Sequence, residues 1–122
     1  MKKYLSAILT VLWSVALPAQ AIFEATADAE QVFVDGYFEV RFTLKNSEGT
    51  NFEPPPFNDF RVLSGPSRSM STTVINGRVS KEMSFSYTLQ PRRTGTFTIS
   101  PAEIMAEGNP LRTDPVRIEV LE

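Results

Sequence analysis

Residues 67–90 read SRSMSTTVINGRVSKEMSFSYTLQ, and this stretch decides the class of fold. Apolar and polar residues alternate on both sides of Asn76-Gly77. Both turn residues tolerate the positive φ that a two-residue type I′ hairpin turn requires. With such a turn Val74 faces Val79, and the apolar residues of the two arms fall on one side. The pattern therefore predicts a long antiparallel β-hairpin with one apolar and one hydroxyl-rich face.

The apolar face of this hairpin changes character toward the turn. Met70 faces Met83 in the predicted register, but closer to the turn Thr72 faces Lys81. A polar pair in the middle of an otherwise apolar face does not suit a buried core. We therefore expect the tip of the hairpin to extend beyond the core of the domain.

The rest of the chain has the same period of two, which is the period of β-strands. Residues 37–45 and the segment around Ile118 alternate in this way, whereas residues 51–60 contain three consecutive prolines. Proline cannot donate to a β-ladder, so residues 51–60 are expected to form an irregular connection between sheets. Three phenylalanines are expected to fix it to the core: Phe52, Phe57 and Phe60. Short strands without helices predict an all-β fold, an immunoglobulin-like β-sandwich over residues 22–122.

The N-terminal residues have the pattern of a secretory signal peptide. Lys2 and Lys3 precede an apolar run over residues 4–17, and Ala19-Gln20-Ala21 supplies small residues around a cleavage site. We therefore predict a signal-peptide helix over residues 1–21, cleaved after Ala21, and export to the periplasm. No later apolar run is long enough to span a bilayer, so no membrane span is expected in residues 22–122.

Composition limits the chemistry that is available to the domain. The sequence has no histidine and no cysteine, the usual ligands of zinc and haem and the usual partners in nucleophilic catalysis. The net charge is −2, and it falls to −4 without the two leader lysines, which argues against nucleic-acid binding. We predict no enzyme activity, no cofactor and no metal. The rival is a small carboxylate hydrolase, which would use acids such as Glu24, Asp28, Asp59 and Glu103.

Positive charge is concentrated in the middle of the chain. Residues 61–93 contain six bases and one acid, whereas residues 22–60 contain eight acids and two bases. A basic element on an acidic domain would attract an acidic protein surface or anionic lipid headgroups, unless neighbouring acids neutralise it in the fold. On the first reading, the predicted protein-interaction residues are Arg68, Arg78, Lys81, Arg92 and Arg93.

Three motifs follow one another along residues 52–102. They are Phe52-x-Pro54-Pro55-x-Phe57-x-x-Phe60-x-Val62-Leu63-x-Gly65-Pro66, then Ile75-Asn76-Gly77 after a serine-rich run, then Tyr87-x-Leu89-x-Pro91-x-x-x-Gly95-x-Phe97-x-Ile99-x-Pro101-Ala102. In order and spacing this set resembles the N-terminal domain of the BatD family, the bacterial oxygen tolerance or aerotolerance proteins. The resemblance covers nearly all of residues 22–122.

The resemblance implies a periplasmic protein that acts in aerotolerance and envelope stress. BatD-like proteins are encoded with MoxR-type ATPases and with membrane proteins that contain von Willebrand factor A domains, which are the partners that the resemblance suggests. They are anchored by later hydrophobic segments, so we expect membrane association only for a longer BatD-like protein. The resemblance carries over no catalytic residue. A carbohydrate- or peptidoglycan-binding domain and a simple spacer remain alternatives.

Overall fold

The computed structural model describes residues 20–122, and every regular element in them is a β-strand. The strands are β1 (Ile22–Ala27), β2 (Gln31–Phe33), β3 (Phe38–Lys45), β4 (Gly49–Glu53), β5 (Phe60–Ile75), β6 (Arg78–Pro91), β7 (Gly95–Ile99), β8 (Glu103–Ala106), β9 (Asn109–Arg112) and β10 (Val116–Leu121). This confirms the all-β class. The predicted signal peptide lies outside the described residues, apart from Gln20 and Ala21. Residues 20–122 contain no helix that could span a bilayer.

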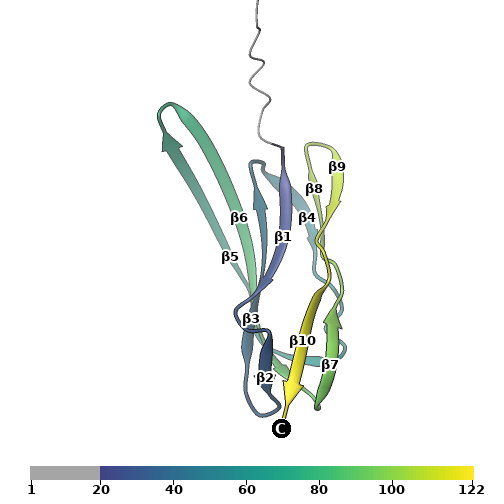
Figure 1. Ribbon diagram of the computed structural model, residues 1–122. Helices are drawn as coiled ribbons and strands as arrows, with labels where there is room; N and C mark the ends of the chain where they lie inside the picture. The colour runs from purple at the N-terminus through teal and green to yellow at the C-terminus, as the bar shows by residue number, and fades with distance from the viewer. Residues whose placement is uncertain (1–19) are drawn as a thin grey trace, which may run out of the picture.

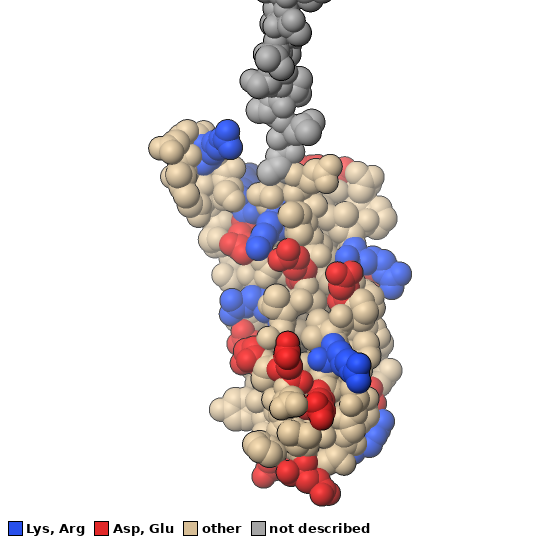
Figure 2. Space-filling model, viewed as in Figure 1, with Lys and Arg blue, Asp and Glu red and all other residues tan. Residues whose placement is uncertain are grey.

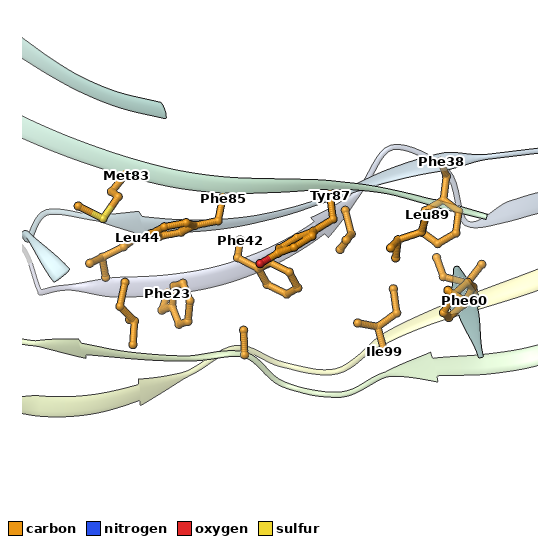
Figure 3. Close-up of a cluster of buried hydrophobic side chains, with 14 of the residues drawn as sticks. Phe23, Phe38, Phe42, Leu44, Phe60, Met83, Phe85, Tyr87, Leu89 and Ile99 are labelled. Carbon is orange, nitrogen blue, oxygen red and sulfur yellow. The ribbon is translucent and has the colours of Figure 1, made fainter. Parts of the chain in front are cut away.

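The strands form three sheets. A four-stranded sheet has the order β1-β3-β6-β5, and two three-stranded sheets have the orders β2-β10-β7 and β4-β8-β9. All pairs are antiparallel except β2 with β10. The two small sheets lie one above the other, opposite the four-stranded sheet (Figure 1). Buried side chains fill the space between these layers (Figure 3).

Strand β3 supplies the centre of the core, as its alternation predicts. Phe38, Val40, Phe42 and Leu44 are each at most 2% exposed, and the charged residues between them face outward. Strand β6 pairs with β3 over eight residues, from Phe38 with Leu89 to Lys45 with Glu82. Apolar side chains at alternate positions of two neighbouring strands thus form one continuous buried face.

The hairpin formed by β5 and β6 has the predicted turn and register. Asn76 and Gly77 have φ values of 51° and 77°, as a type I′ turn requires. Val74 pairs with Val79, and Met70 pairs with Met83. The register shifts twice between Val62 and Ser67, so that the two halves of β5 are separated by irregular pairing.

The proline-rich connection is shorter than predicted, and its phenylalanines anchor it as predicted. Residues 51–53 complete β4, so only the rest of residues 51–60 forms the crossover from β4 to β5. Phe60 is 2% exposed, and Phe57 packs against the core. The ring of Phe52 stacks on Phe85 with 3.9 Å between ring centroids and 1° between ring planes.

Strands β1, β8 and β9 form where the sequence shows no clear alternation. The dipeptide Asn109-Pro110 is typical of a turn that ends a strand, but in the structure it begins β9. The turn lies just before, at Glu107 and Gly108, where φ is 51° and 77°. Strand β9 is at the edge of its sheet, where a proline is tolerated because one side of the strand needs no donor.

Two buried residues connect the two small sheets. The Ala102 N–H donates to Oγ1 of Thr113 at 2.9 Å, and the Thr113 N–H donates to the Ala102 carbonyl at 3.0 Å. Ala102 lies in the connection between β7 and β8, and Thr113 lies in the connection between β9 and β10. Their hydrogen bonds therefore join these two connections. Both residues are at most 3% exposed.

Candidate partner-binding hairpin

The outer part of the β5–β6 hairpin projects from the domain. Every residue from 61 to 82 is exposed, and the alternating burial of β6 begins only at Met83. Figure 1 shows the two strands leaving the four-stranded sheet at an angle, with no layer beneath them. We call residues 67–82 the projecting hairpin. The expectation that the tip extends beyond the core is confirmed.

Three of the five predicted interaction residues lie on the projecting hairpin, in different surroundings. Arg68 pairs with Phe85, and its Cζ lies 5.9 Å from the centroid of that ring. Arg78 is the first residue after the turn. Lys81 forms an ion pair with Glu48, with 2.9 Å between Nζ and Oε1.

The other two, Arg92 and Arg93, lie at the opposite end of β6. The Arg92 N–H donates to the Asp59 carbonyl at 3.2 Å. The Arg93 guanidinium lies 2.8 Å from an oxygen of the Asp59 carboxylate and 4.8 Å from the centroid of Phe97. Arg78 and Arg92 are separated by about 45 Å of extended chain, at roughly 3.3 Å per residue. The five bases therefore belong to two separate regions.

Neighbouring acids neutralise part of the positive charge. Lys81 and Arg93 each form an ion pair, whereas Arg68, Arg78 and Arg92 take part in none of the ion pairs among residues 20–122. The hydrogen bond from Lys81, together with its charge, lowers the pKa of Glu48 below its ordinary value. Figure 2 shows basic side chains near the end of the projection and acidic side chains toward the opposite end of the body.

The sequence pattern did not reveal how apolar the exposed surface of the hairpin is. Met70, Val74 and Val79 are 60–64% exposed, and all three lie on the face that continues the core. Ile75 is 63% exposed on the other face. Alternation alone cannot separate the buried part of a strand from its projecting part. The polar pair formed by Thr72 and Lys81 was the only signal in the sequence.

A shallow concave surface lies at the tip of the projecting hairpin. It is lined by Arg78, Ile75, Asn76 and the hydroxyl residues Thr73 and Ser80. The surface thus combines a guanidinium outside any of the described ion pairs with hydroxyl groups and an aliphatic side chain. Such a combination suits contact with a polar, negatively charged protein surface.

The acids that a carboxylate hydrolase would use lie on separate elements, and each has a structural partner. Three of them form ion pairs: Glu24 with Lys45, Asp59 with Arg93 and Glu103 with Arg112. The fourth, Asp28, accepts a hydrogen bond from the Glu39 N–H at 2.8 Å. Among residues 20–122 no group of three or more acidic side chains is placed to hold a metal ion.

The family of the chain is shown by comparison with models of known protein families. A family model described as "BatD DUF11 like domain" matches residues 25–120. The matched segment begins within β1, ends within β10 and includes the whole projecting hairpin. No curated protein and no solved structure matches the chain.

Proposed function

The chain belongs to the BatD family, through its DUF11-like domain, and from this premise we propose that it is a non-catalytic protein-interaction module of the bacterial periplasm. Its partners are envelope proteins, in the first place membrane proteins with von Willebrand factor A domains that act with MoxR-type ATPases. The role is in aerotolerance and envelope stress, and the projecting hairpin is the contact element.

The exposed apolar face of the projecting hairpin is the observation that carries this proposal. Met70, Val74 and Val79 are all at least 60% exposed. Strand β3 pairs with β6 only from Glu82 onward, so Val74 and Val79 lie on a two-stranded ribbon, and Met70 lies at its base. A two-stranded ribbon by itself is only marginally stable in water, and contiguous exposed apolar side chains commonly mark interaction sites. Contact with a partner would both bury this face and fix the ribbon.

The position of β1 supports export. Strand β1 begins at Ile22, directly after the proposed cleavage site at Ala21. Removal of residues 1–21 would therefore leave all ten strands complete. The domain is then delivered to the periplasm with its fold intact.

We further infer an immunoglobulin-like arrangement, in which the two small sheets are halves of one interrupted sheet. In this reading β7 and β8 form one interrupted strand, and β9 and β10 form another beside it. The hydrogen bonds between Ala102 and Thr113 support it, because they join the two interruptions. The neighbours of this composite pair, β2 and β4, complete a sheet that faces β1-β3-β6-β5.

A pull-down from detergent-solubilised envelope at low salt tests the proposal, with the tagged chain as bait. Two variants accompany the wild type: the double variant Arg78→Glu with Lys81→Glu, and the control Arg92→Glu. Arg92 suits the control because it is exposed, lies outside the described ion pairs and lies at the far end of β6. We expect wild type and control to recover a von Willebrand factor A-domain membrane protein, and the double variant to lose it.

Other results of the pull-down would count against the proposal. Equal recovery with the double variant would remove the projecting hairpin as the contact. Recovery of cell-wall material alone would favour a carbohydrate- or peptidoglycan-binding domain. No enrichment with any bait at low salt would favour a spacer.

A further inference from the structure

Strand β5 leaves one edge of the four-stranded sheet open. It is the last strand in the order β1-β3-β6-β5, and no strand of residues 20–122 pairs with its outer side. An unpaired edge presents a row of backbone N–H and C=O groups that another strand can bind. The irregular pairing between Val62 and Ser67 interrupts the lower part of this edge. The upper part, residues 67–75, pairs with β6 without interruption.

The register shows which backbone groups the open edge offers. Ile75 and Arg78 flank the two-residue turn, so they form a hydrogen-bonded pair, and hydrogen-bonded pairs then alternate with non-bonded ones along the ladder. Hence Thr72 and Lys81 form a non-bonded pair, whose backbone groups point away from each other. The Asn46 N–H donates to the Lys81 carbonyl at 2.8 Å from the β3 side, in agreement with this alternation.

The same alternation assigns the free groups of β5. They belong to four residues on the face that continues the core: Arg68, Met70, Thr72 and Val74. Residues 67–75 contain no proline and no lysine, and Arg68 is their only charged residue. Proteins usually protect an exposed edge with prolines and charged residues, and Arg68 is the only residue of this kind on the edge.

We propose that a strand with an acidic residue from an envelope partner adds to this edge in antiparallel orientation. The side chains of β5 set the chemistry of that strand. It would place a carboxylate beside Arg68, apolar side chains beside Met70 and Val74, and a hydroxyl beside Thr72. This inference rests on the proposed function, because it specifies how the projecting hairpin makes its contact.

Charge decides between an acidic partner and a second copy of this chain. The projecting hairpin carries three bases and one acid, and residues 67–75 contain no acid. Pairing two copies through residues 67–75 of β5 would therefore leave both Arg68 side chains without a carboxylate partner. An acidic strand supplies the missing charge, and this complementarity favours it over a second copy.

A synthetic peptide can serve as the probe, with backbone amide exchange followed by NMR as the measurement. The peptide Thr-Val-Thr-Thr-Thr-Val-Thr-Glu-Thr, blocked at both ends, places its glutamate beside Arg68 and its valines beside Met70 and Val74. One control peptide has lysine in place of glutamate. A second has adjacent valines, which point to opposite faces of a strand.

Strand addition predicts protection at alternate residues. Saturating peptide should slow amide exchange at least about tenfold at the four residues with free groups, because each gains a hydrogen bond. The amides of Ser69, Ser71 and Thr73 already bond to β6 and should change little. Both control peptides should give weaker protection. The variant Arg68→Glu, whose fold is checked by its amide spectrum, should prefer the lysine peptide.

Two results would overturn the inference. Unchanged exchange at all four residues would exclude strand addition, while a loss of partner recovery in the Arg78→Glu, Lys81→Glu double variant would still support the proposed function. Protection of the same four amides without peptide, increasing with protein concentration and accompanied by a dimer in sedimentation, would identify a second copy as the occupant.

Discussion

Met70 and Met83 face each other across the β5–β6 ladder, yet Met70 is 61% exposed and Met83 only 4%. Met83 also pairs with Leu44 of β3, whereas β5 has no neighbour on its outer side. One residue pair thus marks the boundary between the hydrophobic core and the projecting hairpin. The core requires one member of the pair, and the other remains available for contact.

Truncating the two methionines should therefore have unequal effects. Met83→Ala should lower the free energy of unfolding by about 2–5 kcal/mol, because it leaves a cavity in the core. Met70→Ala should change it by no more than about 0.5 kcal/mol, as expected for an exposed position. Urea unfolding measures both values. Similar losses for the two variants would show that the projecting hairpin packs as part of the core.

Tyr87 should make the protein less stable in alkaline solution. Burial raises the pKa of Tyr87 above its ordinary value of 10.0, because the folded state disfavours the charged phenolate. The resulting stabilisation is complete below pH 10.0 and is lost as the pH rises through the higher pKa of the folded state. Urea midpoints between neutral and alkaline pH should fall more steeply for wild type than for Tyr87→Phe. Parallel curves would contradict this.

Thr113 should contribute through its hydroxyl more than through its volume. Thr113→Val keeps the shape of the side chain but removes the acceptor for the buried Ala102 N–H. An unsatisfied buried donor costs about 1–3 kcal/mol, so unfolding should become easier by that amount. Thr113→Ser, which retains the hydroxyl, is the matched control and should lose less. If Val and Ser variants were equally destabilised, packing rather than the hydrogen bond would be responsible.

Two glycines with positive φ should differ in their tolerance of a side chain. At Gly65, where φ is 122°, a Cβ would lie 2.7 Å from the Ser86 carbonyl oxygen and 3.0 Å from Tyr87 Cα. At Gly77, where φ is 77°, a Cβ would meet nothing within 4 Å. Gly77→Ala should therefore cost only the backbone strain of about 1–2 kcal/mol. Gly65→Ala should lower the free energy of unfolding by more. In thermal unfolding, Gly65→Ala should therefore have the lower Tm of the two variants.

The regular part of the fold was predictable because the signals are local. The alternation in β3 gives its buried face directly, and Asn76-Gly77 gives the turn and register of the hairpin. The β8–β9 hairpin was missed because its turn at Glu107-Gly108 lacks a strong sequence signal. Pro110 also resembles a residue that ends a strand. A strand can contain it here because β9 lies at the edge of its sheet.

The candidate site was predictable only in part. Counting charges by segment located the excess of bases, but it cannot tell which end of a long strand each base occupies. Arg78 and Arg92 both belong to the basic residues 61–93, yet they lie at opposite ends of β6. The ion pair of Lys81 with Glu48 joins β6 to the loop between β3 and β4, a contact between residues distant in sequence that no local pattern contains. The exposure of Met70, Val74 and Val79 could not be predicted, because these residues continue the same alternation as the buried residues of the core.

Site-specific photo-crosslinking in the bacterial envelope tests most directly whether the projecting hairpin is the contact. A photoreactive phenylalanine analogue would replace Thr73 in one variant and Thr94 in the other. Both threonines are exposed, but Thr73 lies on the projecting hairpin and Thr94 lies in the β6–β7 turn at the opposite end of β6. We expect an adduct with a von Willebrand factor A-domain membrane protein from Thr73 and none from Thr94. An adduct from Thr94 alone, or equal adducts from both positions, would contradict the assignment of the hairpin as the contact.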